Sequence, residues 1–137
     1  MSFYKKQSNY KSISVRIKDE ALEEQLETHI SYKLIMPRGN VFYNRTRNPQ
    51  DVIRELLAEH GFIRKKGADM SMGERSDWEP GQSIKVSFYR EDADHFRHKA
   101  EELGVKVQEV ITTLLREFFQ LNPPVLEEKV WEAPKFA

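Results

Sequence analysis

Apolar and polar residues alternate in two short stretches of the chain. In residues 12–18 the apolar positions are Ile13, Val15 and Ile17, and in residues 83–89 they are Ile84, Val86 and Phe88. A period of two residues predicts a β-strand with one buried face. The second stretch begins 71 positions after the first, and charged residues follow each stretch at once. Each strand is therefore expected to lead directly into a helix.

Apolar residues at helical spacing predict four helices, over residues 19–30, 49–60, 91–103 and 107–120. Asp19 is expected to cap the first helix, and Asn48-Pro49 has the composition of a helix start. Between these two helices lies a long basic loop, residues 31–47, which Pro37 and Gly39 interrupt. The apolar pairs on either side of this interruption predict a small hairpin.

Both halves of the chain repeat one order of elements: strand, helix, turn, helix. The second helices align, with "NPQDVIRELLAEH" over "KVQEVITTLLREF". The first half has about 13 more residues between its helices, all in the basic loop. The expected organisation is a basic arm (1–11), a first repeat (12–63), a linker (64–82), a second repeat (83–120) and a Pro-rich C-terminal tail (121–137).

One strand with two short helices cannot bury a core, because a lone strand has no ladder partner. The two strands are therefore expected to pair antiparallel, giving a ribbon with two different faces. The apolar face would cover the four helices. The other face would expose residues that are polar or cationic, with no acid among them: Ser12, Ser14, Arg16, Ser83, Lys85 and Ser87. Such a ribbon fits the major groove of DNA, where short polar side chains reach base edges.

The stretch "SIKVSFYREDADHFRHKAEELGVKVQEVITTLLREFF" resembles the ribbon-helix-helix family, the MetJ/Arc superfamily of DNA-binding proteins. Residues 12–30 and 48–60 resemble it more loosely. Family members usually dimerise, so two copies in one chain imply a pseudo-dimer with an α+β, mostly α fold: one two-stranded antiparallel ribbon and four helices. The resemblance implies base contacts from the six outward ribbon residues. It also implies phosphate contacts at the start of each second helix, here Asn48, Gln50, Lys106 and Gln108.

The basic segments supply further candidates for DNA contact. Arg38, Arg45 and Arg47 in the long loop are suited to grip phosphates or a neighbouring minor groove, although loops are also basic by chance. Arg64, Lys65 and Lys66 are expected on a solvated face of the linker, with phosphate contact as the alternative.

Catalytic and metal-binding patterns are weak. His95 and His98 are three residues apart, but two imidazoles without a third ligand make a poor metal site. No nucleophile–base set, phosphate-binding Gly loop or buried carboxylate pair is visible in the sequence. The chain is therefore expected to be neither an enzyme nor a cofactor carrier.

Composition narrows the class of protein. The chain has 137 residues, a hydrophobic content of 39% and no cysteine, which suits a small domain without disulfides. It has no apolar stretch of membrane-spanning length and no signal core, so a cytoplasmic location without a membrane partner is expected. The net charge is zero, but residues 1–66 hold 13 Lys/Arg against 8 Asp/Glu, and residues 67–137 hold 9 against 14. This asymmetry of +5 and −5 allows one positive face.

Together these features predict sequence-specific binding of double-stranded DNA. The role would be that of a transcriptional repressor or a nucleoprotein accessory factor, acting as a monomeric pseudo-dimer that can associate further on DNA. The alternative is an antitoxin-like or adaptor protein whose tail, residues 121–137, binds a protein partner through side chains such as Trp131 and Phe136.

Overall fold

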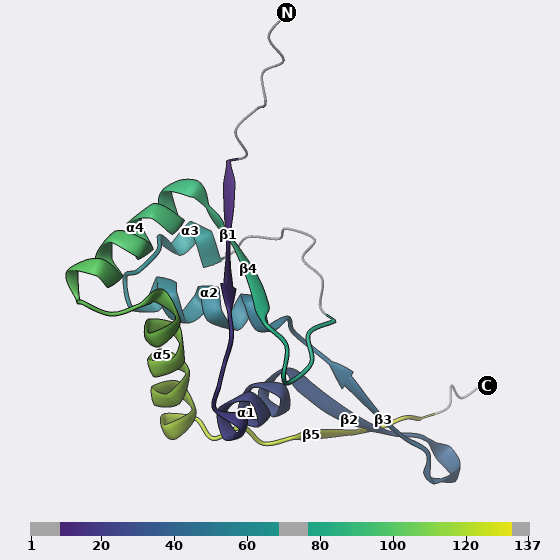
Figure 1. Cartoon of the computed structure of the whole chain (residues 1–137). Helices are drawn as coiled ribbons and strands as arrows, with labels where there is room; N and C mark the ends of the chain where they lie inside the picture. The colour runs from purple at the N-terminus through teal and green to yellow at the C-terminus, as the bar shows by residue number, and fades with distance from the viewer. Residues whose placement is uncertain (1–8, 69–76, 133–137) are drawn as a thin grey trace, which may run out of the picture.

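The computed structural model describes residues 9–68 and 77–132. Its elements in chain order are β1 (Tyr10–Val15), α1 (Glu20–Ile30), β2 (Ser31–Ile35), the 3-10 turn η1 (Pro37–Gly39), β3 (Val41–Arg45), α2 (Pro49–Glu59), α3 (Lys65–Ala68), β4 (Ile84–Tyr89), α4 (Arg90–Glu102), α5 (Val107–Leu121) and β5 (Glu127–Val130). The fold of these residues is α+β, with two small sheets, β1-β4 and β3-β2-β5. Figure 1 shows the β1–β4 ribbon in the middle, with α4 and α5 to one side of it and the second sheet projecting to the other.

The antiparallel ribbon expected from the alternation is confirmed. β1 and β4 pair from Tyr10 opposite Tyr89 to Val15 opposite Ile84. The first strand lies about two residues earlier than the alternation predicts, so it begins inside the expected arm. It ends after Val15 because the chain turns into α1, where the Asp19 carboxylate accepts hydrogen bonds from the amides of Ala21 and Leu22.

The inner face of the ribbon covers the core. All six apolar positions of the two alternating stretches are at most 5% exposed. On this face α4 contacts both strands, and α2 contacts β4 and α5. The ring of Phe96 in α4 packs edge-on against those of Phe62 and Phe88. Burial of each such side chain contributes about 1.5–3 kcal/mol to stability. The register that buries all six is therefore strongly favoured over one shifted by a residue.

Helices form over all four stretches where the apolar spacing predicts them. The expected total of four is nevertheless one short, because the described residues include a fifth, short helix, α3, in the segment expected to be linker. The described ends of that segment lie on the body of the protein. Gly67 is buried against Asp92, and Trp78 is buried with its indole N–H donating to the carbonyl of Gln82 at 2.9 Å.

The second sheet enlarges the small hairpin expected in the basic loop. β2 and β3 pair antiparallel along five residues each. The tail adds a third strand, β5, parallel to β2, with a Lys33–Glu128 ion pair of 3.4 Å and a hydrogen bond from the Trp131 amide to the Ile35 carbonyl. The short, charged run of β5 does not alternate, so periodicity gave no sign of this strand. The expected partner-binding residue Phe136 lies outside the described residues.

Candidate nucleic-acid interface

The outer face of the β1–β4 ribbon is polar. Its cross-strand pairs are Tyr10 with Tyr89, Ser12 with Ser87, and Ser14 with Lys85. Ser12, Ser14 and Lys85 are exposed, Ser87 is half-buried, and the hydroxyls of Ser12 and Ser87 lie 3.3 Å apart. Four of the six residues expected on this face are therefore on the outer surface of the paired strands. None of them is acidic, so a phosphate backbone can approach without charge repulsion.

The register gives the ribbon an internal two-fold relation. Ser14 and Lys85 are 71 residues apart, the same offset that separates the two alternating stretches, and they lie directly opposite each other. The amide of Arg90 donates to the carbonyl of Asn9, which makes Ser14 and Lys85 a non-hydrogen-bonded pair, with their side chains close together. The centre of the outer face is thus a serine paired with a lysine.

The other two expected ribbon residues lie just beyond the paired strands. Ser83 precedes β4 and is exposed. Arg16 follows β1, and its guanidinium donates to the Glu23 carboxylate at 3.2 Å and to the Gln82 carbonyl at 3.4 Å. The Arg16 side chain keeps 40% exposure, so this ion pair orients it at the end of the ribbon without burying it.

Helix α2 fixes the outer edge of β4 from beneath. The Gln50 amide donates to the carbonyl of Lys85 at 3.3 Å, and the Arg54 guanidinium donates to the carbonyl of Ser87 at 3.0 Å. Gln50 and Arg54 are one helical turn apart, so they reach alternate carbonyls of the strand. The Gln50 side chain is buried and supports the ribbon, which disfavours the phosphate contact expected at Gln50.

A cleft of about 440 Å³ lies between the β1–α1 connection and the start of α5. Four cations and two acids are among the residues that line it: Arg16, Lys18, Lys106 and Arg116, with Asp19 and Glu109. Arg116 pairs with Asp19 at 3.5 Å, whereas Lys106 and Gln108 are exposed at the first turn of α5. The Lys106 cap makes no side-chain hydrogen bond to that turn, so the expected anion site at the α5 N-terminus is open.

The other end of the ribbon has cations that sequence reasoning assigned to a linker face. The Lys66 ammonium lies 5.3 Å from the centroid of the Tyr89 ring, and Tyr89 stacks at 5.5 Å on Tyr10 of the paired strand. Lys65 and Lys66 are both exposed. Tyr10 begins β1 and Tyr89 ends β4, so the antiparallel pairing brings these two tyrosines to one end of the ribbon. No pattern in the sequence indicated that a basic segment would come to this place.

Arg64 positions this basic segment. Its Nε donates to the buried Asp92 carboxylate at 2.8 Å, and its terminal nitrogen reaches Glu91 at 2.9 Å. The hydrogen bond to Asp92 raises the pKa of the Arg64 guanidinium, with the charges of both acids adding to the effect. The positive charge of Arg64 is therefore balanced by these two carboxylates, and Arg64 anchors α3 to the start of α4. Lys65 and Lys66 remain as exposed charges there.

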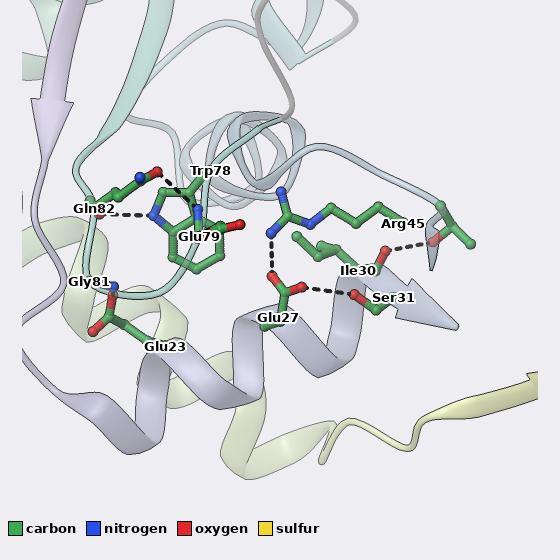
Figure 2. A network of polar contacts seen from close by, with 10 residues as sticks. Glu23, Glu27, Ile30, Ser31, Arg45, Trp78, Glu79, Gly81 and Gln82 are labelled. Carbon is green, nitrogen blue, oxygen red and sulfur yellow. Dashed lines mark hydrogen bonds and ion pairs between the residues drawn. The ribbon is translucent and has the colours of Figure 1, made fainter. Parts of the chain in front are cut away.

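The start of α2 differs from the start of α5. Figure 2 shows Arg45 pointing at Glu27, and their ion pair measures 2.6 Å. The Arg45 guanidinium also lies 5.5 Å from the centroid of the Trp78 ring. The phosphate contact expected from Arg45 stays a prediction, and it is disfavoured because the Arg45 charge is already paired with Glu27 inside this network.

Two other residues near this helix start are partly engaged. Arg47 pairs with Glu55 at 2.5 Å, and Asn48 is half-buried at the cap position with no side-chain hydrogen bond to the helix. Arg38 is exposed in η1, at the turn between β2 and β3, and so belongs to the second sheet. The cations suited to a DNA backbone therefore gather at the two ends of the ribbon more than at the α2 N-terminus.

Other types of site have little support within residues 9–68 and 77–132. No group of three or more His, Cys, Asp or Glu side chains there is arranged to hold a metal ion. His98 pairs with Glu102 at 3.0 Å along its own helix. None of the helices in this part of the chain has the length and apolar character needed to span a bilayer.

Comparisons of the chain with protein families, with curated proteins and with solved structures found no match. The inference of function therefore depends on the geometry of the ribbon and the cations at its ends.

Proposed function

We propose that this chain binds double-stranded DNA in a sequence-specific manner, with the β1–β4 ribbon in the major groove. It would act as a transcriptional repressor or as an accessory factor of a nucleoprotein assembly. The observation that carries the proposal is the acid-free outer face, centred on the Ser14–Lys85 pair and packed on its other side against the core. A two-stranded ribbon is narrow enough for the major groove, and serine hydroxyls and an ammonium group are donors that base edges accept.

The charges around the ribbon also support docking of its outer face on DNA. Lys106 and the open first turn of α5 flank one end of the ribbon, and Lys65 and Lys66 flank the other. A duplex lying across the outer face would meet cations on both sides, which is how phosphate contacts fix register while base contacts read sequence. The net charge of zero does not oppose this, because association responds to the local field of one face.

The resemblance of the sequence to the ribbon-helix-helix family supports the proposal. In that family two chains supply one strand each, whereas here β1 and β4 come from one chain. Because Ser14 stands opposite Lys85 and not opposite a second copy of itself, the preferred site would be asymmetric about the ribbon centre.

Selection from a pool of random duplexes tests the proposal directly. The expected result is an enriched motif whose binding is at least about 1,000-fold tighter than that of random duplex. Enrichment with no sequence consensus would reduce the proposal to non-specific binding. Absence of any duplex binding, even at low salt where phosphate contacts are strongest, would refute it.

A protein-binding role is the second candidate, favoured by the exposure of the tail. Leu121 is 82% exposed, Val125 85% and Val130 70%. Deleting residues 123–137 removes β5 and leaves α5 whole. Unchanged DNA selection together with loss of a co-purifying protein would favour this role, whereas unchanged DNA selection with no such loss would count against it.

A further inference from the structure

The second sheet has one edge that is unlike the other. Strand β3 forms this edge, and three consecutive apolar residues on it are exposed: Val41 at 42%, Phe42 at 52% and Tyr43 at 68%. The opposite edge is β5, with the sequence Glu127–Val130 and three charges in four residues. Charged side chains commonly protect an edge strand from pairing with another chain, and β3 has no such protection from Val41 to Asn44.

The backbone of β3 also presents hydrogen-bonding groups to the outside. The Thr46 amide donates to the Ile30 carbonyl at 2.7 Å, and the Met36 amide donates to the Asn40 carbonyl at 2.8 Å. Both bonds belong to the β2–β3 pairing, so the even-numbered residues of β3 direct their N–H and C=O groups toward β2. Val41 and Tyr43 therefore direct theirs away from β2, where the described residues supply no further strand.

We propose that β3 is a self-association edge that pairs antiparallel with β3 of a second copy of this chain. A two-fold axis beside Tyr43 would place Tyr43 opposite the same residue of the other copy, with both exchanging backbone hydrogen bonds. The result is one continuous sheet of six strands, three from each copy. A second copy fits this edge because both copies direct their N–H and C=O groups outward from the same odd-numbered residues of β3, and the two-fold axis brings these groups together.

The charges are compatible with this pairing. Arg45 is the only charged residue of β3, and it is held by Glu27 at 2.6 Å. With Tyr43 opposite Tyr43, Phe42 faces Asn44 and Val41 faces Arg45 of the other copy. No two charges therefore oppose each other, and the central aromatic pair favours such a ladder.

The association would be weak between free monomers. A five-residue strand edge offers less contact area than the ~1,200–2,000 Å² typical of stable complexes. Binding to neighbouring DNA sites would raise the effective concentration of one edge at another. The edge itself does not depend on DNA, so the inference is testable without any duplex.

Sedimentation analysis of the full chain without DNA tests it, over about 1 µM to 1 mM, a range that covers weak affinities. The expected result is a reversible monomer–dimer equilibrium. Tyr43→Pro removes the central outward N–H but no β2–β3 hydrogen bond, so the hairpin should persist and the dimer should be lost. Val130→Lys places a charge on the other edge of the same sheet and serves as a matched control that should still dimerise.

A charge-pair experiment fixes the register. Tyr43→Lys and Tyr43→Glu should each be monomeric alone, because two-fold pairing sets like charges opposite each other. An equimolar mixture of the two variants should dimerise, because the same pairing then sets opposite charges together. A wild-type chain that stays monomeric throughout, a dimer that survives Tyr43→Pro, or a mixture that stays monomeric would overturn the proposal.

Discussion

Lys85→Ala is the sharpest test of how the ribbon meets DNA. Lys85 is exposed at the centre of the outer face, opposite Ser14, and its backbone carbonyl accepts a hydrogen bond from the Gln50 amide. Removing the ammonium group should therefore leave the fold intact, with a change in unfolding free energy within about 0.5 kcal/mol. Any loss of DNA affinity would then report on the interface.

The expected loss depends on what Lys85 contacts. A base contact is worth about 1–3 kcal/mol of discrimination, which corresponds to a 5- to 150-fold fall in the ratio of specific to random affinity. A phosphate contact would weaken specific and random binding together and leave that ratio unchanged. The ratio therefore distinguishes the two contacts, whereas the affinity for one duplex does not.

The assay is fluorescence anisotropy with a selected duplex and a scrambled one, at one fixed salt concentration. Lys129→Ala is the matched control, because it removes the same charge from an exposed position on β5, in the other sheet. Ser14→Asp should abolish binding to both duplexes by placing a carboxylate at the ribbon centre. An unchanged ratio for Lys85→Ala, with the fold intact, would refute base readout by the ribbon centre.

Three further predictions concern the ribbon ends, its support and the pH dependence of stability. Lys66→Ala and Lys106→Ala should each lower the slope of log affinity against log salt by about 0.9 and leave the specific-to-random ratio unchanged; a changed ratio would contradict a pure phosphate contact. Arg54→Met should lower the unfolding free energy in urea by about 1–3 kcal/mol, because it removes the buried hydrogen bond from the guanidinium to the Ser87 carbonyl beneath the ribbon, and a change near zero would show that this bond does not stabilise β4. Burial, and then the charge of Arg47, lower the pKa of His29, so the folded state binds fewer protons than the unfolded state. Stability should therefore be full above pH ~6.5 and fall as the pH drops below it, and urea midpoints for His29→Phe should show a smaller fall than those of the natural chain.

The sequence determined the ribbon and the helices that it covers. Alternation over Ile13–Ile17 and Ile84–Phe88 specifies strands with one buried face, and the same order of elements in both halves means that each strand lacks a partner until it meets the other. Burying one face fixes register, because a slip of one residue would expose every apolar side chain of the strand. This part of the fold follows from local periodicity and needs no knowledge of distant contacts.

Only the tertiary structure decided which polar groups remain available to a ligand. Arg45 pairs with Glu27, 18 residues away, and Gln50 bonds to the backbone 35 residues away. Two side chains expected to contact phosphate therefore make their bonds inside the protein. The same folding brings Lys66 to the ring of Tyr89 at the ribbon end. An ion pair or hydrogen bond depends on distances of a few ångströms between residues far apart in sequence, and periodicity contains no information about those distances.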